Sequence, residues 1–341
     1  MRVARVDAGG GQEGWVGAVL ARDVLDDSGH VALAKGHRLV AGDAGVIAGD
    51  ELHIVWLDAD DVDEDTAATR LAHAVAGPGV ERHPPVESQV RLSATRRGIV
   101  RVDVDALASV NGVDGVTVFT LEDGTPVDAQ RTIGGAKVTS LAIARAALEQ
   151  ALTRASAAHG PIVGVRAFEP LRLGAVVRQR LGEHAQAKLE SNLQVRADWF
   201  GGSLGAIAHV GDDSADIAAA LRTAMATSDI VLAAGVASVD PLDPTWRALL
   251  EAGATPIRRG LAVHPGSSYW LASCGAALVI GVASCGMLSR RSALDLLLVR
   301  RFTGEPIDDA FLTGLGHGGL LGPEAAWRIP PYGTALQAVE D

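Results

Sequence analysis

The chain has 341 residues, of which 48% are hydrophobic and 21% are charged, and its formal net charge is -11. This composition supplies enough apolar surface for a folded core and excludes a disordered tail. The acidic balance argues against general nucleic-acid binding, which needs a basic face, but it leaves room for an anion held by backbone N–H groups. The length predicts two domains, and the two cysteines indicate neither a disulfide framework nor a zinc site.

The first half of the chain, residues 1–158, predicts a mixed α+β region. Strands are expected where apolar runs stand between turn signals, over 14–24 and 51–57. A helix is expected over 61–79, because acids fill its first turn and a Gly-Pro pair closes it. The acidic run 58–65 is interpreted as compensation of the helix dipole, with a metal site as the alternative reading.

Three further segments complete this region. Residues 91–112 predict a strand, a turn, a strand and a short helix, and 116–138 predict strands around an Asp-Gly turn. Residues 140–158 are apolar at helical spacing and run into "HGPIVG", which we interpret as a domain boundary or connector.

The second half alternates strands and helices at short intervals. This rhythm predicts an α/β domain over 159–305, with a mostly parallel sheet flanked by helices, followed by a C-terminal tail over 306–341. The expected strands cover 172–178, 204–210, 229–234, 258–266 and 276–283. The expected helices cover 182–202, 211–228, 244–253 and 287–304.

One uncharged segment, residues 267–289, is long enough to be weighed as a membrane span. It is interrupted by five serines and three glycines, so a buried strand with flanking loops is the preferred interpretation. The N-terminus has no apolar core of signal-peptide length. The sequence therefore predicts a cytoplasmic protein without a membrane anchor.

The first candidate site follows the apolar run "DIVLAA", where the chain reads "GVASVDPLD". Ligands of open parallel sheets bind beyond the carboxyl ends of the strands, so this turn is well placed to hold one. Gly235 permits a positive φ, and the amides of Ser238 and Val239 are candidates to cradle an anion. Asp240 and Asp243 are candidates to hold a metal or position a substrate, while capping of the next helix is the alternative for Asp243.

Two further strand ends carry small residues. In "HPGSS", Pro265 and Gly266 predict a tight turn that exposes N–H groups, and Ser267 adds a hydroxyl; an ordinary turn is the alternative. In "ASCGMLSRR", Ser284 and Cys285 precede a helix, and a redox role for the cysteine is the minor alternative to a small buried residue. Three such loops at one edge predict a shallow N–H-rich pocket suited to a phosphate-bearing ligand.

Two stretches resemble a known family. "LAAGVASVDPLDPTWRALLEAGATPIRRGLAVHPG" and "VIGVASCGMLSRRSALDLLLVRRFTG" are similar to the molybdopterin-binding domain of molybdenum-cofactor biosynthesis proteins, in the subgroup that resembles the molybdopterin molybdenumtransferase. "RLSATRRGIVRVD" in the first half and "LGHGGLL" near the end fall in the expected order. The resemblance implies molybdopterin, or its adenylated form, as the ligand.

The resemblance also implies site residues. Its ligand loops correspond to Gly235, Ser238, Asp240, Asp243, Pro265, Gly266, Ser284 and Cys285. Asp240 and Asp243 would be the catalytic pair, holding Mg²⁺ or orienting molybdate. Three departures touch these loops: Val236 replaces a glycine, "VVRQRLG" replaces a Thr-Gly strand end, and "GVASCG" lacks the usual proline.

Three functional readings follow from the resemblance and stay open. The chain is an enzyme that inserts molybdenum, a carrier that delivers the cofactor to a molybdoenzyme without inserting metal, or a divergent member that keeps the fold for association only. Nucleic acid and membranes are not expected partners. By analogy with the family, a homo-oligomer is expected.

Overall fold

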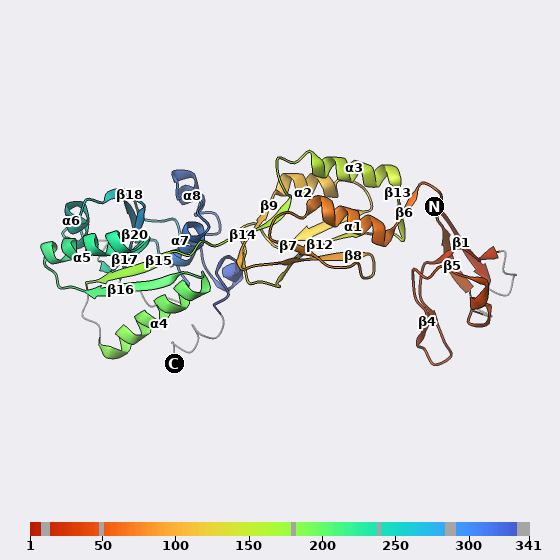
Figure 1. Ribbon diagram of the computed structural model, residues 1–341, viewed down its shortest axis with the longest axis horizontal. Coiled ribbons are helices and arrows are strands. Elements are labelled where there is room, and N and C mark those ends of the chain that lie inside the picture. The colour runs from red at the N-terminus through yellow and green to blue at the C-terminus, as the bar shows by residue number, and fades with distance from the viewer. Residues whose placement is uncertain (8–13, 48–50, 179–181, 237–239, 284–290, 333–341) are drawn as a thin grey trace. The chain divides into compact units, whose positions relative to one another are not determined.

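The computed structural model describes residues 1–7, 14–47, 51–178, 182–236, 240–283 and 291–332 (Figure 1). The chain divides into two compact units. Unit 1 comprises residues 1–95, 101–123 and 130–164. Unit 2 comprises residues 96–100, 124–129 and 165–341. Two short segments of unit 2 are thus surrounded in sequence by unit 1.

The N-terminal part of unit 1 contains two small antiparallel sheets. The first has the order β1-β5-β2, formed by β1 (Arg2–Asp7), β5 (Glu51–Trp56) and β2 (Val19–Leu20). The second pairs β3 (Val24–Leu25) with β4 (Val31–Leu33), and η3 (Ala41–Gly45) follows. The prediction of one continuous strand over 14–24 is wrong. Gly17 turns the chain at φ 85°, and its N–H donates to the Leu39 carbonyl.

The rest of unit 1 combines helices with a four-stranded sheet of order β10-β12-β8-β7. Its strands are β10 (Val116–Thr120), β12 (Thr132–Val138), β8 (Gln89–Ala94) and β7 (Val80–Arg82). Helix α1 (Glu64–Val75) packs on β8 and β12, while α2 (Val104–Asn111) and α3 (Arg145–Ser156) pack on each other. The smaller strands of unit 1 are β6 (Asp61–Asp63) and β13 (Ala142–Ala144). β9 (Gly98–Val102) and β14 (Val163–Ala167) include residues of both units, and β11 (Pro126–Val127) belongs to unit 2.

The start of α1 follows the expected pattern. Glu64 and Asp65 lie in its first turn, where carboxylates oppose the positive end of the helix dipole. The Asp63 carboxylate accepts a hydrogen bond from the Thr66 N–H at 3.0 Å, which caps the helix. The dipole reading of the acidic run is therefore confirmed for these residues.

Unit 2 is built on a six-stranded sheet of order β16-β15-β17-β20-β19-β18. The strands are β15 (Arg172–Val177), β16 (Ser203–His209), β17 (Ile230–Val236), β18 (Thr255–Arg259), β19 (Trp270–Cys274) and β20 (Ala277–Ala283). The pairs among β16, β15, β17 and β20 are parallel, and β19 is antiparallel to both its neighbours. The prediction of a mostly parallel sheet is confirmed.

Helices cover both faces of this sheet, as the alternation of strands and helices along the sequence predicts. Side chains alternate along each strand, so Val231 and Ala233 join the core with α5 (Ser214–Thr227) and α6 (Pro244–Glu251). Leu232 and Ala234 point the other way and join the core with α4 (Glu183–Trp199) and α7 (Ala293–Phe302). Helix α8 (Asp309–Gly314) and η5 (Pro323–Arg328) contribute residues to this second core.

Two strands differ from the sequence expectation. The strand expected over 258–266 occupies only β18 and ends at Arg259, because Gly260 turns the chain at φ 75°. The uncharged segment 267–289 contains two antiparallel strands rather than one, and Gly275 makes the turn between β19 and β20 at φ 56°. No helix in the described part of the chain is both long and apolar enough to cross a membrane.

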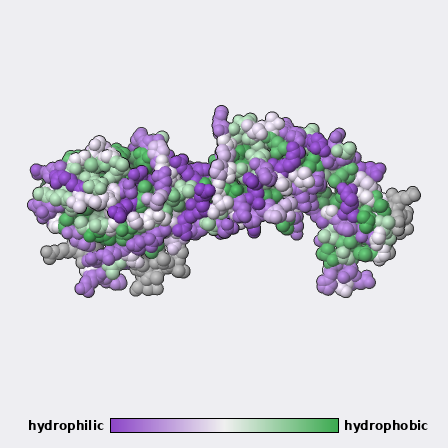
Figure 2. Space-filling view, in the orientation of Figure 1, coloured by the Kyte–Doolittle hydropathy of each residue, from purple (hydrophilic) through white to green (hydrophobic). Residues whose placement is uncertain are grey.

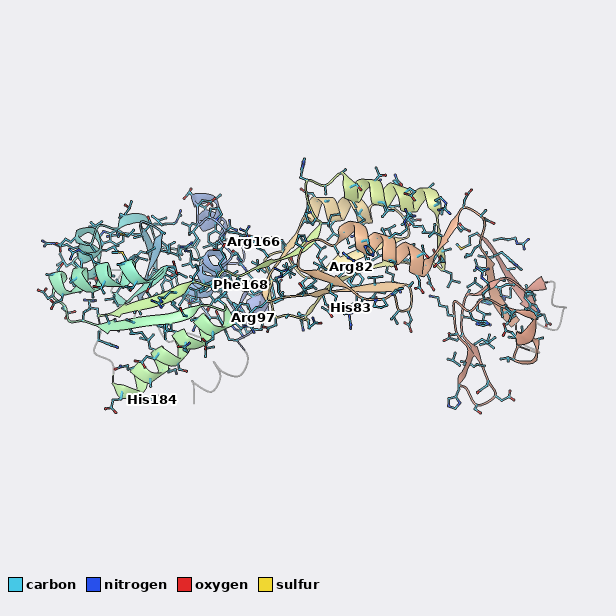
Figure 3. The ribbon with its side chains drawn as sticks, in the orientation of Figure 1. Arg82, His83, Arg97, Arg166, Phe168 and His184 are labelled. Carbon is cyan, nitrogen blue, oxygen red and sulfur yellow. The ribbon has the colours of Figure 1, made fainter. Side chains whose placement is uncertain are left out.

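Contacts of Arg97 with a cluster of aromatic residues explain why residues 96–100 belong to unit 2. Phe168, labelled in Figure 3, has its ring centroid 4.9 Å from that of Phe200 and 5.2 Å from that of Trp199. The Arg97 guanidinium donates to the Trp199 carbonyl at 2.8 Å and to Asp128 at 2.7 Å. These bonds hold both interleaved segments of unit 2 against α4. The face of unit 2 seen in Figure 2 mixes hydrophilic and hydrophobic side chains.

Candidate functional site

The parallel strands of unit 2 bring several chain segments to one edge. β15, β17 and β20 are neighbours and run parallel, so they end side by side at Val177, Val236 and Ala283. We call this edge of the sheet the carboxyl edge. It is the place where open α/β sheets bind ligands.

The first predicted loop begins with a bulged glycine. Ala234 pairs with Val282 and Val236 pairs with Ala283, so Gly235 is an extra residue in β17. Its φ is 83°, which confirms that this position needs the left-handed backbone that glycine adopts freely. The next predicted residues, Ser238 and Val239, lie outside the described residues, as do Ser284 and Cys285 of the third loop.

The Pro-Gly turn lies against the helix that follows β20. The Pro265 carbonyl accepts a hydrogen bond from the Ala293 N–H at 2.9 Å. Gly266 has φ 119°, and a Cβ added to it would lie 2.5 Å from the Ala293 Cβ, so the close approach requires glycine. Ser267 is exposed at this turn. The second predicted loop therefore contacts the start of α7, where the third predicted loop ends.

The motif "LGHGGLL" reaches the same turn from the C-terminal part of the chain. The His264 N–H donates to the Gly319 carbonyl at 2.8 Å, and the Leu321 N–H donates to the His264 carbonyl at 2.8 Å. A Cβ on Gly319 would lie 2.2 Å from the Ala262 carbonyl oxygen, so this crossing also requires glycine.

Asp243 caps α6 and forms an ion pair at the same time. One carboxylate oxygen accepts a hydrogen bond from the Thr245 N–H at 2.9 Å, which confirms the capping reading. The other oxygen accepts from Arg178 Nη2 at 2.7 Å, and only 4% of the Asp243 side chain is exposed. Asp240 lies on the exposed part of the turn and accepts from the Leu242 N–H at 2.9 Å.

Arg178 connects three strand ends through its guanidinium. It directly follows β15, and its backbone N–H donates to the Ala234 carbonyl at 3.0 Å. Nη2 also donates to the Gly235 carbonyl at 3.0 Å, and Nη1 donates to Asp212, beyond the end of β16, at 3.1 Å. The sequence marked this arginine only as a departure from the expected strand end. Its partners could not be predicted from the local sequence, because they belong to or follow other strands.

Two buried polar atoms next to Asp243 lack partners. Among the described residues, neither Arg178 Nε nor Thr245 Oγ1 has a hydrogen-bond partner, although both atoms are buried. An unsatisfied buried donor or acceptor costs about 1–3 kcal/mol. In the described part of the chain, buried side-chain atoms of Trp15, His53, Glu64 and Trp199 are in the same state, so this feature alone does not mark a site. Arg178 and Thr245 both contact the Asp243 carboxylate.

The donor set around Asp243 does not fit Mg²⁺. That ion takes oxygen ligands in near-octahedral geometry, and both Asp243 oxygens already accept hydrogen bonds, one of them from a cation. Within the described ranges, there is no cluster of three or more histidine, cysteine, aspartate or glutamate side chains suited to a metal. The Asp243 carboxylate is thus occupied by hydrogen-bond donors and is not arranged to hold a divalent cation.

A second arginine–aspartate pair lies at the start of α7. Arg196 Nε donates to an Asp295 oxygen at 2.9 Å, and their side chains are 2% and 0% exposed. The Tyr332 hydroxyl donates to the same oxygen at 2.8 Å, and the Ser292 N–H donates to the other at 3.0 Å. Burial would lower the pKa of Arg196, but the Asp295 charge raises it above its ordinary value. No sequence pattern pointed to this group.

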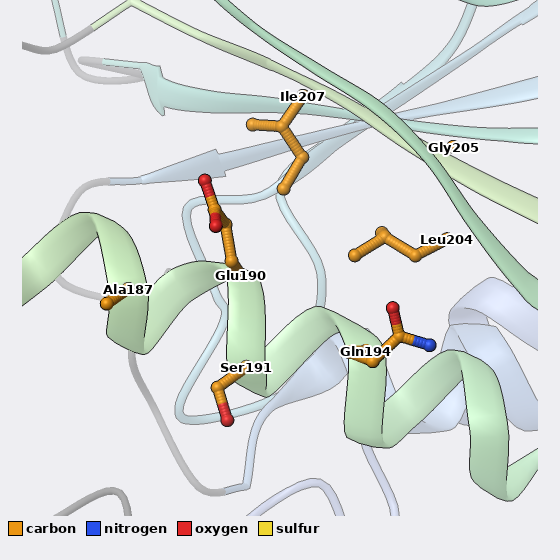
Figure 4. A pocket seen from close by; sticks show the side chains of 7 residues that line it. All are labelled: Ala187, Glu190, Ser191, Gln194, Leu204, Gly205 and Ile207. Carbon is orange, nitrogen blue, oxygen red and sulfur yellow. The ribbon is translucent and has the colours of Figure 1, made fainter.

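A separate hollow of about 510 Å³ lies between α4 and β16 (Figure 4). It is lined by Ala187, Glu190, Ser191, Gln194, Leu204, Gly205 and Ile207. Its polar side chains bond along α4, since Glu190 accepts from Gln186 at 3.1 Å and Gln194 donates to Asp198 at 2.6 Å. The carboxyl edge is therefore the better candidate for a polar ligand.

Residues 176–299 match the family model described as a probable molybdopterin binding domain. The match begins in β15 and ends within α7, so it contains the loops of the carboxyl edge. It confirms the resemblance inferred for the second half of the sequence. No curated protein matches the chain.

Several solved structures are similar to the chain. A molybdopterin biosynthesis MoeA protein from Pyrococcus horikoshii is 13% identical over 72% of this chain and 81% of its own, with a TM-score of 0.30. The molybdopterin biosynthesis enzyme MoaB from Thermus thermophilus is 20% identical over 40% of this chain and 98% of its own, also with a TM-score of 0.30.

Proposed function

We propose, from the premise that residues 176–299 are a domain of the molybdopterin-binding family, that this chain binds molybdopterin or its adenylated form. The binding site is the carboxyl edge of the unit 2 sheet, and the role is in biosynthesis or delivery of the molybdenum cofactor. The family match to the segment that contains this edge is the observation that carries the proposal.

The geometry of the edge supports a phosphate-bearing ligand. Amides at the starts of α6 and α7 already bond to the side chains of Asp243 and Ser292, so the proposed ligand contacts lie in the loops rather than at these helix starts. The proposed ligand contacts are those that the resemblance implies: Gly235, Ser238, Val239, Pro265, Gly266, Ser267, Ser284 and Cys285. Small residues at these positions let a large polar ligand approach the backbone.

Binding and delivery fit the site better than metal insertion does. Insertion through Asp240 and Asp243 requires carboxylates that are free to hold a cation or molybdate. Asp243 instead holds the guanidinium of Arg178 at 2.7 Å. Delivery requires an acceptor, which by the chemistry of the cargo is a molybdoenzyme.

The test is a calorimetric titration of the full chain with molybdopterin, using two matched variants. Ser267→Asp adds a negative charge at the Pro-Gly turn, and Ser203→Asp adds one at the first residue of β16, on the opposite edge of the same sheet. Both serines are exposed, so neither change disturbs a core.

We expect saturable binding that Ser267→Asp weakens by at least about tenfold, because a carboxylate there repels the ligand phosphate. Ser203→Asp is expected to leave the affinity unchanged. Equal weakening by both variants would move the site away from the carboxyl edge, and the absence of binding to the unaltered chain would refute the proposed function.

A further inference from the structure

The buried carboxylate of Asp243 already has a positive partner. A carboxylate with 4% of its side chain exposed is costly to bury without a compensating charge or several hydrogen-bond donors. Arg178 supplies that charge at 2.7 Å, and the backbone of Thr245 supplies a second donor at 2.9 Å. The place that a divalent cation would take at this carboxylate is therefore filled by a side chain of the protein itself.

The two arms of the Arg178 guanidinium are held very differently. Nη2 is fixed, because it donates to the buried Asp243 and to the carbonyl of the bulged Gly235. Nη1 donates to Asp212, whose side chain is 84% exposed, at 3.1 Å. An exposed ion pair of this kind contributes little, since water and salt screen it. Nη1 is thus the arm that can exchange its partner.

A guanidinium is well suited to this double task. It stays charged at all relevant pH values, and its planar fork can hold a carboxylate on one side and a phosphate oxygen on another. Arg178 keeps 16% of its side-chain surface exposed at the carboxyl edge. Its buried Nε has no acceptor among the described residues, so the group has not used all of its donors there.

We propose that Arg178 takes the place of a divalent cation at Asp243 and binds the anionic end of the ligand through Nη1, releasing Asp212. The inference rests on the proposed function and adds that ligand binding at this edge needs no metal ion. It assigns Arg178 as a binding residue, Asp243 as the residue that positions it, and Asp212 as a competitor for the ligand anion.

The first arm of the test uses metal alone. The full chain is titrated with Mn²⁺, which stands in for Mg²⁺, and free ion is counted by electron paramagnetic resonance. We expect no stoichiometric site. One Mn²⁺ bound per chain, and lost in Asp243→Asn, would overturn the inference without any need for the organic ligand.

The second arm measures molybdopterin affinity with EDTA and with excess Mg²⁺. We expect the two values to agree within about twofold. Arg178→Gln should weaken binding by at least about tenfold in both buffers, with Arg178→Lys intermediate because it keeps the charge but loses the fork. Asp212→Asn should tighten binding, because it removes the competing carboxylate. Thermal unfolding of each variant checks that it is folded.

The outcomes separate the two proposals. Binding that requires Mg²⁺, or that folded Arg178→Gln leaves unchanged, overturns the role of Arg178 while the proposed function stands. A chain that binds no molybdopterin in either buffer overturns both.

Discussion

Two arginine–aspartate pairs in unit 2 have the same chemistry and different surroundings. Arg196 and Asp295 are enclosed, and the two Asp295 oxygens accept hydrogen bonds from Arg196, Tyr332 and the Ser292 amide. Arg178 and Asp243 lie at the carboxyl edge, where one arm of the arginine meets an exposed carboxylate. A closed pair of this kind fixes a structure, whereas a partly open one can still exchange partners.

Both pairs join distant segments to the start of a helix. Asp295 belongs to the capping box of α7, so its ion pair and its bond with Tyr332 fix that helix to α4 and to the segment that contains Tyr332. Asp243 caps α6 and holds the end of β15 through Arg178. Of the two arginines, Arg178 is the one whose buried Nε has no hydrogen-bond partner among the described residues.

The largest predicted effect is a difference in stability between variants of the two arginine–aspartate pairs. Asp295→Ala should lower the free energy of unfolding by about 3–5 kcal/mol, because it leaves a buried arginine uncompensated. Asp243→Ala should cost about 1–2 kcal/mol, mainly for the lost helix cap, since Arg178 keeps Asp212 and the Gly235 carbonyl. Denaturant unfolding of both variants measures the difference, and equal losses would erase the distinction between a closed and an open pair.

A smaller effect concerns the pH dependence of the closed pair. Burial raises the pKa of the Tyr332 phenol well above its ordinary value, and the neighbouring Asp295 charge raises it further. Folding therefore favours the protonated phenol, so the contribution of Tyr332 is complete below its ordinary pKa of about 10 and is lost as the pH rises above it.

Tyr332→Phe should cost about 1 kcal/mol at neutral pH, for the lost hydrogen bond to Asp295. The difference in unfolding free energy between the unaltered chain and the variant should shrink or reverse above about pH 10. A difference that stays constant with pH would show that the phenol titrates normally in the folded chain.

Local sequence signals predicted the architecture of unit 2 well. The buried parallel strands are continuous apolar runs, and the caps of α5 and α6 at Asp213 and Asp243 are visible beside them. The separate strand β19 was missed because only Gly275 and its neighbour divide it from β20 inside an uncharged stretch. The strand expected over 14–24 failed because Gly17 turns the chain within an otherwise apolar run.

The sequence predicted single residues of the candidate site, but not the contacts between them. Gly235, Gly266 and Asp243 stand out in sequence because turns and caps have local signatures. The bond from Arg178 to Asp243 spans 65 residues, and the bond from Arg196 to Asp295 spans 99. Such pairs arise from strand order and helix placement, which a single sequence does not specify at that precision.

The most direct measurement is a crystal structure of the full chain with molybdopterin bound. We predict ligand density at the carboxyl edge, beside the Pro-Gly turn, with an anionic oxygen at Arg178 Nη1 and Asp212 turned away. Ligand density in unit 1 or at the opposite edge of the six-stranded sheet would contradict it.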